Sequence, residues 1–538
     1  MSAPSLVSLL LPWLAGVAIG LGLLLWGWRW LLRRGPEVAG AAASGLRTLR
    51  DAAGRIPAVR AWIARHPRAV QFLQARVSPA SFTGLPLTLL TLAFLYTVSL
   101  LLGIVQDYLF SDPLIAADLR LANLLYAFRT PAGLTVFAFV TLFGSTRVIV
   151  VTAAVLSVAL WFQRQRLFLV TLWLTLVVSE GATVLGKTLV HRARPDVLLR
   201  AITETSFSFP SGHATAAAAF YGVVAYLGIR TSQTWRARVH TLFGVLLGVG
   251  LIDVSRLYLG VHFLSDVLAG DLVGLAGLLF AVSVTEWRLA VGPHPSLRAV
   301  SPALLVSGAA ELLLVVTVFV VTPPALLHPE PPAPRPVEAR SVPALFDQGT
   351  LPRLTETILG TPQEPVNVIV IAPEGCLVPA LERAHWLLAD RLSVDSLRRA
   401  ISAALRGGED PRAPLTPSFY ATRPHDYGFE KATEAKTVRV RHHARVWRTG
   451  YVTERGALFV GTVSLDTGMK WGITHTIAPD IDTERELLVA DVERAGGLVA
   501  PQRLRLVPPM LARNFAGDPF FTDGQARLVT LPCGNPDR

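Results

Sequence analysis

Residues 246–280 read LLGVGLIDVSRLYLGVHFLSDVLAGDLVGLAGLLF, and this stretch decides the fold of the first half of the chain. It joins two apolar runs, 239–258 and 263–285, across a short break with polar residues at its edges. Each run has the length, about 20 residues, that an α-helix needs to cross the hydrocarbon core of a bilayer. The pattern predicts two successive membrane-spanning helices with their polar residues at a shared end.

Similar apolar runs recur along the chain and stop near residue 322. The composition agrees with a membrane protein, since 51% of the 538 residues are hydrophobic, 16% are charged and the mean hydropathy is +0.46. We expect an all-α polytopic membrane helix bundle of about eight spans, followed by a soluble α+β domain. The expected spans are 6–32, 85–106, 134–162, 167–187, 214–230, 239–258, 263–285 and 302–322.

Basic residues between the runs predict the orientation of the chain in the membrane. Segment 33–80 is rich in Arg and poor in acids, and its apolar residues are spaced for short amphipathic helices on the cytoplasmic surface. With this segment inside, the basic loops 163–166, 230–238 and 288–298 also fall inside, which supports the count of spans. Residues 188–212 and 259–262 and the C-terminus then lie outside.

The net charge of +12 is accounted for by these loops, and no basic stretch interleaved with aromatic residues predicts nucleic-acid binding. The composition divides the chain into an N-terminal anchor with its amphipathic segment (1–80), a membrane core (81–290), a last transmembrane helix (291–325), a Pro-rich linker (326–345) and the α+β domain (346–538). In that domain we expect strands at 366–371, 437–447, 457–465 and 470–477, and helices at 378–388, 394–405 and 483–495.

Both cysteines, Cys376 and Cys533, lie in the C-terminal domain. A disulfide and two separate buried thiols would each account for them. Because the expected topology places this domain in an oxidising compartment, we expect an intrachain disulfide.

Three polar stretches lie at the outer ends of expected helices, and the first is Lys187 to Pro195. Lys187 and Arg194 are seven residues apart, which places both on one helix face. A Lys and an Arg on one face form an attractive site for an anion such as phosphate. Two basic side chains that reach out to lipid head groups would give the same spacing.

The second stretch, Pro210 to His213, precedes an expected helix. Ser211 and Gly212 fit a helix N-terminus whose free N–H groups can bind an anion. His213 in the first turn is placed to donate a proton to a leaving oxygen. An ordinary N-cap without function is the alternative for these residues alone.

The third stretch runs from Ser255 to Asp266. His262 and Asp266 are spaced i, i+4 and share a helix face, so Asp266 can orient the imidazole as a nucleophile. Arg256 is brought to the same place by a short turn. A structural His–Asp pair in a helix bundle is the alternative interpretation.

Together, the three stretches resemble the signature of the type 2 phosphatidic acid phosphatase superfamily: Lys-x6-Arg-Pro, Pro-Ser-Gly-His and Ser-Arg-x5-His-x3-Asp. The resemblance covers residues 85–285, which hold six of the expected spans, and no signature position departs from it. It implies a six-helix phosphatase core that needs neither a metal nor another cofactor.

The resemblance also implies a role for each residue of the signature. His262 would attack phosphorus with support from Asp266, and His213 would protonate the leaving group. The remaining residues would bind the phosphoryl oxygens: Lys187, Arg194, Ser211, Gly212 and Arg256. The expected activity is the hydrolysis of a lipid phosphate or diphosphate through a phosphohistidine.

The tail resembles the C-terminal domain named after LssY, which bacteria attach to this phosphatase core. The resembling stretches are 417–420, 441–447 and 474–485. A group of His and acidic residues in them could form a metal or second catalytic site: His442, His443, His475, Asp480, Asp482 and Glu484. A surface cluster followed by a helix N-cap at Asp482 is the simpler interpretation.

From topology and resemblance we expect a multi-pass protein of the bacterial inner membrane, with the active site and the C-terminal domain on the periplasmic side. Membrane lipids are its expected partners, and the C-terminal domain can bind a further envelope partner. Candidate substrates are a polyprenyl diphosphate such as undecaprenyl diphosphate, phosphatidic acid, phosphatidylglycerol phosphate and lipid A phosphates, with the outer loop 107–133 contributing to the choice. The alternatives are a lipid phosphate carrier or scramblase, and an envelope-binding module in which the tail is the functional part.

Overall fold

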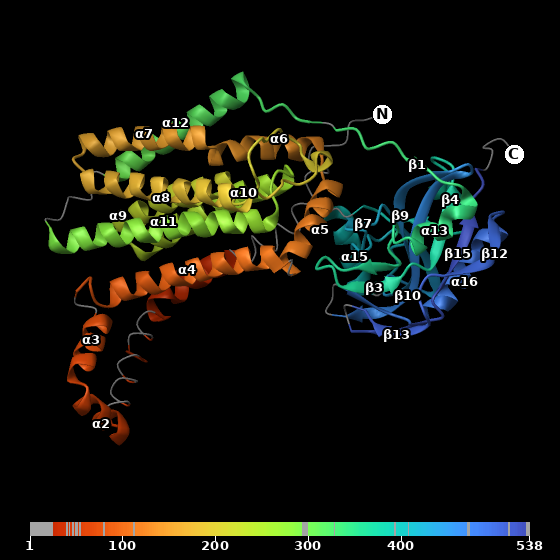
Figure 1. Ribbon diagram of the computed structural model, residues 1–538, viewed down its shortest axis with the longest axis horizontal. Helices are drawn as coiled ribbons and strands as arrows, with labels where there is room; N and C mark the ends of the chain where they lie inside the picture. The colour runs from red at the N-terminus through yellow and green to blue at the C-terminus, as the bar shows by residue number, and fades with distance from the viewer. Residues whose placement is uncertain are drawn as a thin grey trace. The chain divides into compact units, whose positions relative to one another are not determined.

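The computed structural model describes residues 25–38 and 55–533 apart from the gaps 79–80, 111–112, 293–299, 328, 392–393, 407, 471–473 and 515–516, and isolated residues between 41 and 52. The chain divides into two compact units, shown with their elements in Figure 1. We call the one formed by Val17–Asp112 and Pro131–His328 the membrane unit. The C-terminal unit contains Pro113–Thr130 and Pro329–Arg538.

The membrane unit is a bundle of long apolar helices, and each span expected between residues 85 and 322 corresponds to helix. Within the described residues six helices are long and apolar enough to cross a membrane, or seven if a bent pair counts as one span. The chain is therefore a multi-pass membrane protein. The helices are α4 (Leu85–Phe110), α6 (Pro131–Val140), α7 (Thr146–Phe162), α8 (Arg166–Val190), α9 (Gly212–Thr231), α10 (Trp235–Tyr258), α11 (Leu264–Val291) and α12 (Val300–Val321).

One expected span is broken. The run 134–162 was expected as a single helix, but α6 and α7 meet at an angle of 46° across the 3-10 turn Thr141–Gly144. Ser145 starts a new helix there, because its side chain accepts a hydrogen bond from the Val148 N–H and its backbone is extended. The expected first span, 6–32, lies mostly outside the described residues, which show helix at 25–38.

Small residues bring α9 and α11 into close contact. A Cβ added at Gly270 would lie 2.6 Å from the Ser211 carbonyl oxygen, and one at Gly274 would lie 2.7 Å from the Thr215 carbonyl oxygen. Only glycine permits such an approach, which is typical of helix pairs in membranes. This contact holds the start of α9 against the start of α11, where two of the polar stretches lie.

The Arg-rich segment before the bundle contains two helices, α2 (Pro57–Arg65) and α3 (Pro67–Val77), as its spacing predicted. Neither helix buries a residue. Exposed apolar side chains, Trp62 and Phe72 among them, lie beside Arg residues on these helices. Such a surface is suited to the interface between membrane and water.

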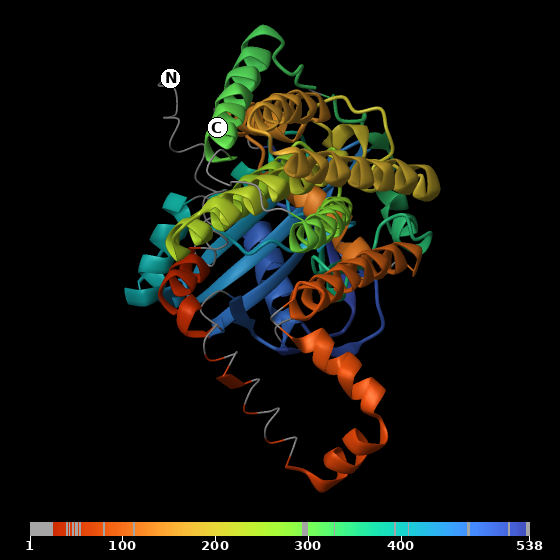
Figure 2. The ribbon, with the colours of Figure 1, turned by 90° about the vertical axis from the view of Figure 1, so that its left-hand side faces the viewer.

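The C-terminal unit is an α+β domain built on a nine-stranded sheet, whose long strands Figure 2 shows in blue. The order along the sheet is β12-β15-β4-β10-β9-β8-β5, with β1 (Arg335–Pro336) beside β9 and β11 (Thr474–Ile477) beside β10. The main strands are β4 (Val368–Ala372), β5 (Leu387–Leu388), β8 (Tyr427–Thr437), β9 (Val440–Thr453), β10 (Gly456–Lys470), β12 (Leu498–Arg505) and β15 (Gln525–Thr530).

Helices cover both faces of this sheet. On one face α14 (Leu377–Arg383) and α16 (Ile481–Arg494) pack on a core that includes Phe429 and Trp386. On the other face α13 (Val342–Asp347) packs around Trp447. Because β4 is buried along its whole length, its sequence is a continuous apolar run. Such a run is typical of a buried strand, so β4 could be predicted from the sequence.

The expected elements of this domain are present, with shifted ends. The helix expected at 378–388 ends at Arg383, and Leu387–Leu388 form β5 instead. The expected run 470–477 is divided between the end of β10 and β11 (Thr474–Ile477). The N-cap of α16 is Asp480 rather than Asp482, since the Asp480 carboxylate accepts from the Asp482 and Thr483 N–H groups.

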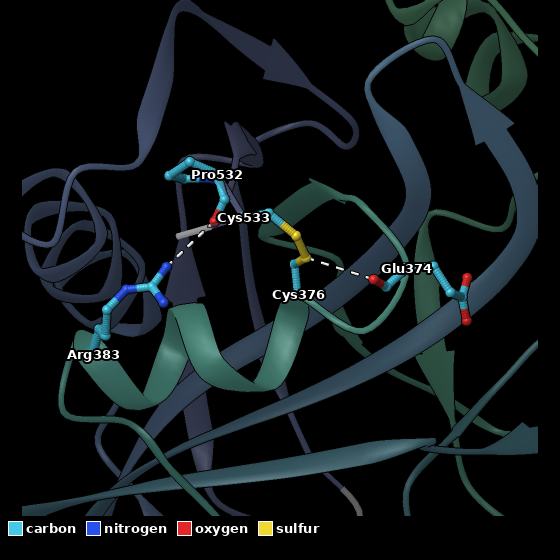
Figure 3. Close-up of a disulfide and its surroundings, with 5 residues drawn as sticks. All are labelled: Glu374, Cys376, Arg383, Pro532 and Cys533. Carbon is cyan, nitrogen blue, oxygen red and sulfur yellow. Dashed lines mark hydrogen bonds between the residues drawn. A yellow bond between two sulfur atoms is a disulfide. The ribbon is translucent and has the colours of Figure 1, made fainter. Parts of the chain in front are cut away.

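The two cysteines form an intrachain disulfide, as expected (Figure 3). Cys376 precedes α14, Cys533 follows β15, and their Cα atoms are 5.3 Å apart. Beside it, Arg383 donates a hydrogen bond to the Pro532 carbonyl oxygen at 3.3 Å. The bond closes a loop over 157 residues, so it removes much of the entropy of the unfolded chain.

An additional helix, α5 (Pro113–Ala127), occupies the loop that was expected to follow the first core span, and it packs within the C-terminal unit. Arg120 Nη2 lies 2.5 Å from Glu356 Oε2. Asn123 donates hydrogen bonds to the carbonyl and hydroxyl oxygens of Thr422 at 3.1 and 3.2 Å. Within the C-terminal unit, α5 is thus linked by polar contacts to the residues around Glu356 and Thr422.

Candidate active site

The structure places the eight predicted site residues at the ends of four helices of the membrane unit. Lys187 is in the last turn of α8 and Arg256 in the last turn of α10. Ser211 is the N-cap of α9, and Asp266 is in the first turn of α11. Gly212 and His213 are the first two residues of α9.

Two expected positions are wrong. The left-handed conformation of His191 ends α8 after Val190, so Arg194 lies in the following loop and not on one helix face with Lys187. His262 precedes α11, which begins at Leu264, so it does not share a helix face with Asp266.

His262 and Asp266 are neighbours, with a serine between them. The distance from His262 Nδ1 to Asp266 Oδ2 is 3.6 Å, longer than a hydrogen bond. Ser208 Oγ lies 3.4 Å from the same Nδ1 and donates a hydrogen bond to Asp266 Oδ2. The backbone N–H of Phe263 donates to this carboxylate oxygen at 2.9 Å.

A buried arginine holds the other oxygen of Asp266. Arg192 Nη1 lies 2.7 Å from Asp266 Oδ1 and 2.6 Å from Ser265 Oγ. The Arg192 guanidinium also stacks over the rings of Phe263 and Tyr108, with centroid distances of 4.5 and 5.0 Å. These contacts fix the carboxylate while its second oxygen faces the imidazole.

Arg194 contacts the outer nitrogen of the imidazole. Its Nη1 lies 3.1 Å from His262 Nε2 and donates to the Val261 carbonyl oxygen at 2.7 Å. Its Nε donates to the Ser206 carbonyl oxygen at 2.6 Å. Because a guanidinium can only donate, Nε2 is the acceptor in this contact, and the ring proton resides on Nδ1, which faces Asp266.

The other two cations lie at the same helix ends. Arg256 is fully buried and donates from Nη1 to Thr141 Oγ1 at 2.9 Å, while its Nη2 lies 2.5 Å from Glu204 Oε1. Lys187 Nζ donates to the Phe207 carbonyl oxygen at 2.5 Å. Both therefore bind the segment between α8 and α9.

The start of α9 completes the group. The Ser211 N–H donates to the Asp266 carbonyl oxygen at 2.9 Å, which fixes α9 to α11. No atom lies within 4 Å of a Cβ added at Gly212, so the space beside its backbone is open. His213 follows Gly212 in the first turn of α9.

A cavity of ≈ 370 Å³ opens beside these residues. Of the predicted residues, Lys187 and Arg194 line it, whereas His262 is only 2% exposed and lies behind Arg194. The full lining is Lys187, Arg192, Ala193, Arg194, Arg200, Glu204, Thr205, Ser206 and Phe207. A cavity with this many cations is suited to an anion.

The surroundings of His262 favour its neutral form. Burial lowers the pKa of His262 well below 6.5, and the neighbouring cations, Arg256 first, lower it further. An imidazole that is neutral at physiological pH retains the lone pair on Nε2 that a nucleophile needs.

Three residues of this site were not predicted from the sequence: Arg192, Glu204 and Ser208. Arg192 lies within the first polar stretch, two residues before Arg194, and only its proximity to that motif could have indicated it. Glu204 and Ser208 belong to the loop before α9, whose sequence shows no periodic pattern.

The candidate metal site of the C-terminal unit is not supported. His442 Nδ1 pairs with Glu484 Oε2 at 2.7 Å, and His443 Nδ1 pairs with Asp466 Oδ1 at 3.0 Å, so the two imidazoles have different partners. Among the residues that the structure describes, no group of three or more His, Cys, Asp or Glu could hold a metal ion. Side-chain positions at His475 lie outside the described part.

His443 belongs instead to a buried polar network across β9 and β10. Its Nε2 is 3.0 Å from Ser464 Oγ and 2.8 Å from Arg445 Nη1. Ser464, His443 and Asp466 are each at most 5% exposed. Because the serine is enclosed and an arginine shares its imidazole partner, this group fits a structural network of the sheet better than a second catalytic site.

A comparison with known proteins decides the family. The chain is 32% identical over 174 residues to phosphatidylglycerophosphatase B of Bacillus subtilis (strain 168), a match that covers 31% of this chain and 80% of the relative. The chain belongs to the PAP2 superfamily. Residues 167–290 match the PAP2 superfamily model, and residues 348–526 match the model described as LssY C-terminus.

Two solved structures are also similar. A transmembrane PAP2 type phosphatidylglycerolphosphate phosphatase from Bacillus subtilis is 26% identical, with a TM-score of 0.32, over 37% of this chain and 96% of that one. Aquifex aeolicus LpxE is 24% identical, with a TM-score of 0.26, over 31% of this chain and 94% of that one. The two family models and the B. subtilis relative show that the chain combines a PAP2 membrane phosphatase domain with a C-terminal LssY domain.

Proposed function

We propose that this PAP2 phosphatase hydrolyses a membrane lipid phosphate or diphosphate through a covalent phosphohistidine on His262. The contact that supports this most directly joins Arg194 Nη1 to His262 Nε2 at 3.1 Å. It places a phosphate-binding guanidinium beside the nitrogen that carries the ring's lone pair, with Asp266 behind the opposite nitrogen.

In the first step, Arg194 Nη1 transfers its hydrogen bond from His262 Nε2 to a phosphoryl oxygen. The freed lone pair of Nε2 attacks phosphorus, and the bond from phosphorus to the leaving oxygen breaks. His213 gives that oxygen a proton, so the leaving group departs as the lipid alcohol or, from a diphosphate, as a protonated lipid monophosphate. The positive charge that develops on His262 is stabilised by Asp266, which Arg192 fixes in place. In the second step water attacks phosphorus, the bond to nitrogen breaks, and His213 takes the proton from water.

The phosphoryl oxygens gain negative charge during both steps. Arg194, Arg256 and Lys187 would stabilise them, with the hydroxyl of Ser211 and the open backbone at Gly212 assisting. Charge stabilisation by fixed donors is the main requirement of phosphoryl transfer, so these side chains can support the reaction.

Lipids fit as substrates because the site lies at the ends of membrane-spanning helices. The B. subtilis relative is named for activity on phosphatidylglycerophosphate. We propose the same class for this chain, with undecaprenyl diphosphate and phosphatidic acid as further candidates. By the distribution of basic loops, we place the active site and the C-terminal domain on the periplasmic side of a bacterial inner membrane.

For the domains we keep the proposed division into 1–80, 81–290, 291–325, 326–345 and 346–538. In this scheme the LssY-like domain would bind an envelope partner. Partner binding by this domain is compatible with hydrolysis, because the signature residues all lie in the membrane unit.

A phosphate-release assay tests the proposal. The full-length protein in detergent micelles is given phosphatidylglycerophosphate, phosphatidic acid, undecaprenyl diphosphate and a lipid A phosphate. His262→Ala should abolish release, while the matched control His66→Ala, an exposed histidine near α2, should leave it unchanged. Binding of these lipids without release by the wild-type protein would favour a carrier or scramblase instead.

A further inference from the structure

A carboxylate already pairs with the guanidinium groups that the proposed reaction needs. Glu204 lies in the loop between α8 and α9, and its Oε1 is 2.5 Å from Arg256 Nη2. Its Oε2 is 3.7 Å from Arg194 Nη2. Arg194 is the residue whose other terminal nitrogen contacts His262. A phosphoryl group that reaches His262 must therefore compete with Glu204 for the same donors.

The pairing with Arg256 is incomplete. Arg256 Nη1 binds Thr141 and Nη2 binds Glu204, but Nε is buried and has no hydrogen-bond partner among the described residues. The Nε–Nη2 edge of a guanidinium can hold two oxygens of one phosphoryl group. Glu204 thus makes one bond at an edge where a phosphoryl group would make two.

The loop around Glu204 allows this side chain to withdraw. Ala201 is fixed before it, since its N–H donates to the Leu259 carbonyl oxygen at 2.8 Å. Ser206 is fixed after it by Arg194. Between these anchors Thr203 and Thr205 are exposed, so Glu204 can turn towards solvent without breaking either anchor.

Glu204 carries a full charge at neutral pH. Burial alone would raise its pKa, but the attraction and hydrogen bond of Arg256 and the attraction of Arg194 outweigh burial and lower the pKa. An incoming anion therefore meets a charged competitor.

We propose that Glu204 is a resident counter-ion of Arg256 and Arg194 that an incoming phosphoryl group must displace before it reaches His262. A terminal phosphate monoester or diphosphate has enough oxygens to bind both arginines in its place. This inference rests on the proposed function, and it concerns how a phosphate ester enters the site.

The test measures binding of inorganic phosphate to the intact protein in detergent by calorimetry at pH 7. Glu204→Gln keeps the shape of the side chain and removes its charge, so it should bind phosphate at least about tenfold more tightly than the wild type. The matched control is Glu286→Gln, which removes the charge of a glutamate that also pairs with an arginine, Arg230, at 2.5 Å. The control should bind phosphate as the wild type does.

A second measurement follows turnover of a phosphate monoester, p-nitrophenyl phosphate. Glu204→Gln should lower the KM for this ester about tenfold, because the ester no longer has to displace a charged group. Glu204→Asp keeps the charge but shortens the side chain, so it should change phosphate binding and turnover less than Glu204→Gln does. This variant replaces Glu204→Gln in both measurements if the Gln variant does not fold.

Equal or weaker phosphate binding by the folded Gln and Asp variants would overturn the inference, and Glu204 would then be a structural support for Arg256. Failure of the proposed function has a different signature: the wild type would release no phosphate from any lipid. The phosphate titration does not depend on turnover, so the two failures are distinguishable.

Discussion

Arg192 Nη1 donates a hydrogen bond to Asp266 Oδ1 across 2.7 Å, although the two residues are 74 positions apart in the chain. Asp266 is fully buried and Arg192 is 6% exposed, so each is the other's main compensation for burial. The pair connects the segment after α8 to the start of α11. It thereby fixes the carboxylate that faces the nucleophilic imidazole.

Removing this arginine should damage both stability and catalysis. We expect Arg192→Ala to lower the free energy of unfolding by about 3 kcal/mol, because it leaves a buried carboxylate unpaired. It should lower kcat more than it raises KM, since Arg192 positions Asp266. Arg192→Lys should restore part of kcat, and Arg147→Ala, an exposed arginine of α7, should change neither quantity. A normal kcat in a folded Arg192→Ala protein would contradict this role.

The close contact of α9 with α11 should not tolerate a larger residue. A Cβ at Gly274 would lie 2.7 Å from the Thr215 carbonyl oxygen. We therefore expect Gly274→Ala to destabilise the membrane unit by about 1–3 kcal/mol. Gly248→Ala on α10 is the control, because nothing lies within 4 Å of its added Cβ. Thermal melting in detergent distinguishes the two, and equal melting temperatures would refute the proposed packing constraint.

The disulfide should stabilise the C-terminal unit without supporting catalysis. We expect the variant with both Cys376→Ser and Cys533→Ser to lose about 4 kcal/mol of that unit's stability, because the unfolded chain regains the entropy of a long loop. Limited proteolysis of the full-length protein should show earlier cleavage after residue 330. Phosphate release should persist, and its loss under non-denaturing conditions would show that the domain is needed for activity.

Stability of the C-terminal unit should fall in acid. Burial lowers the pKa of His425 to about 3, and the charges of Arg445 and His443 add to this. The unfolded state, with an ordinary histidine pKa near 6.5, therefore binds more protons than the folded state between about pH 6.5 and 3. Stability is lost as the pH falls through this window, by less than about 1.4 kcal/mol per pH unit because His425 is partly exposed.

Calorimetry of the full-length protein between pH 3 and 7 measures this dependence. In the His425→Gln variant, the melting temperature should decrease less as the pH falls from 7 to 3. The control His385→Gln, at an exposed histidine, should show the same decrease as the wild type. If the melting temperature of a folded His425→Gln protein decreased in acid as much as that of the wild type, groups other than His425 would cause the loss of stability.

The local part of the site was predictable from the sequence. His262 and Asp266 are four residues apart and Ser211 precedes an apolar helix, so their spacing in the sequence indicated their roles, although His262 lies just before α11. The spans expected between residues 85 and 322 correspond to helix, apart from the break at Thr141–Gly144, because length and hydropathy depend on neighbouring residues only. Long-range partners such as Glu204 and Ser208 were not predictable, since their contacts depend on how a non-periodic loop folds over helix ends.

In the C-terminal unit, too, local features were predicted from the sequence and long-range ones were not. Buried strands such as β4 were expected from their apolar residues, whereas β8 was missed because half of it, around Glu434, is exposed and polar. The helix α5 was missed as well, since 15 residues are too few for a span and its partners Glu356 and Thr422 lie far along the chain.

The central claim is that His262 becomes phosphorylated, and trapping this intermediate tests it most directly. The protein is mixed with a lipid substrate labelled with ³²P in its terminal phosphate and quenched in alkali, in which phosphohistidine survives. We predict labelled wild-type protein, with the phosphate on the peptide that contains His262, and no label in His262→Ala. Label at another residue, or phosphate release by a His262→Ala protein at the wild-type rate, would contradict the account.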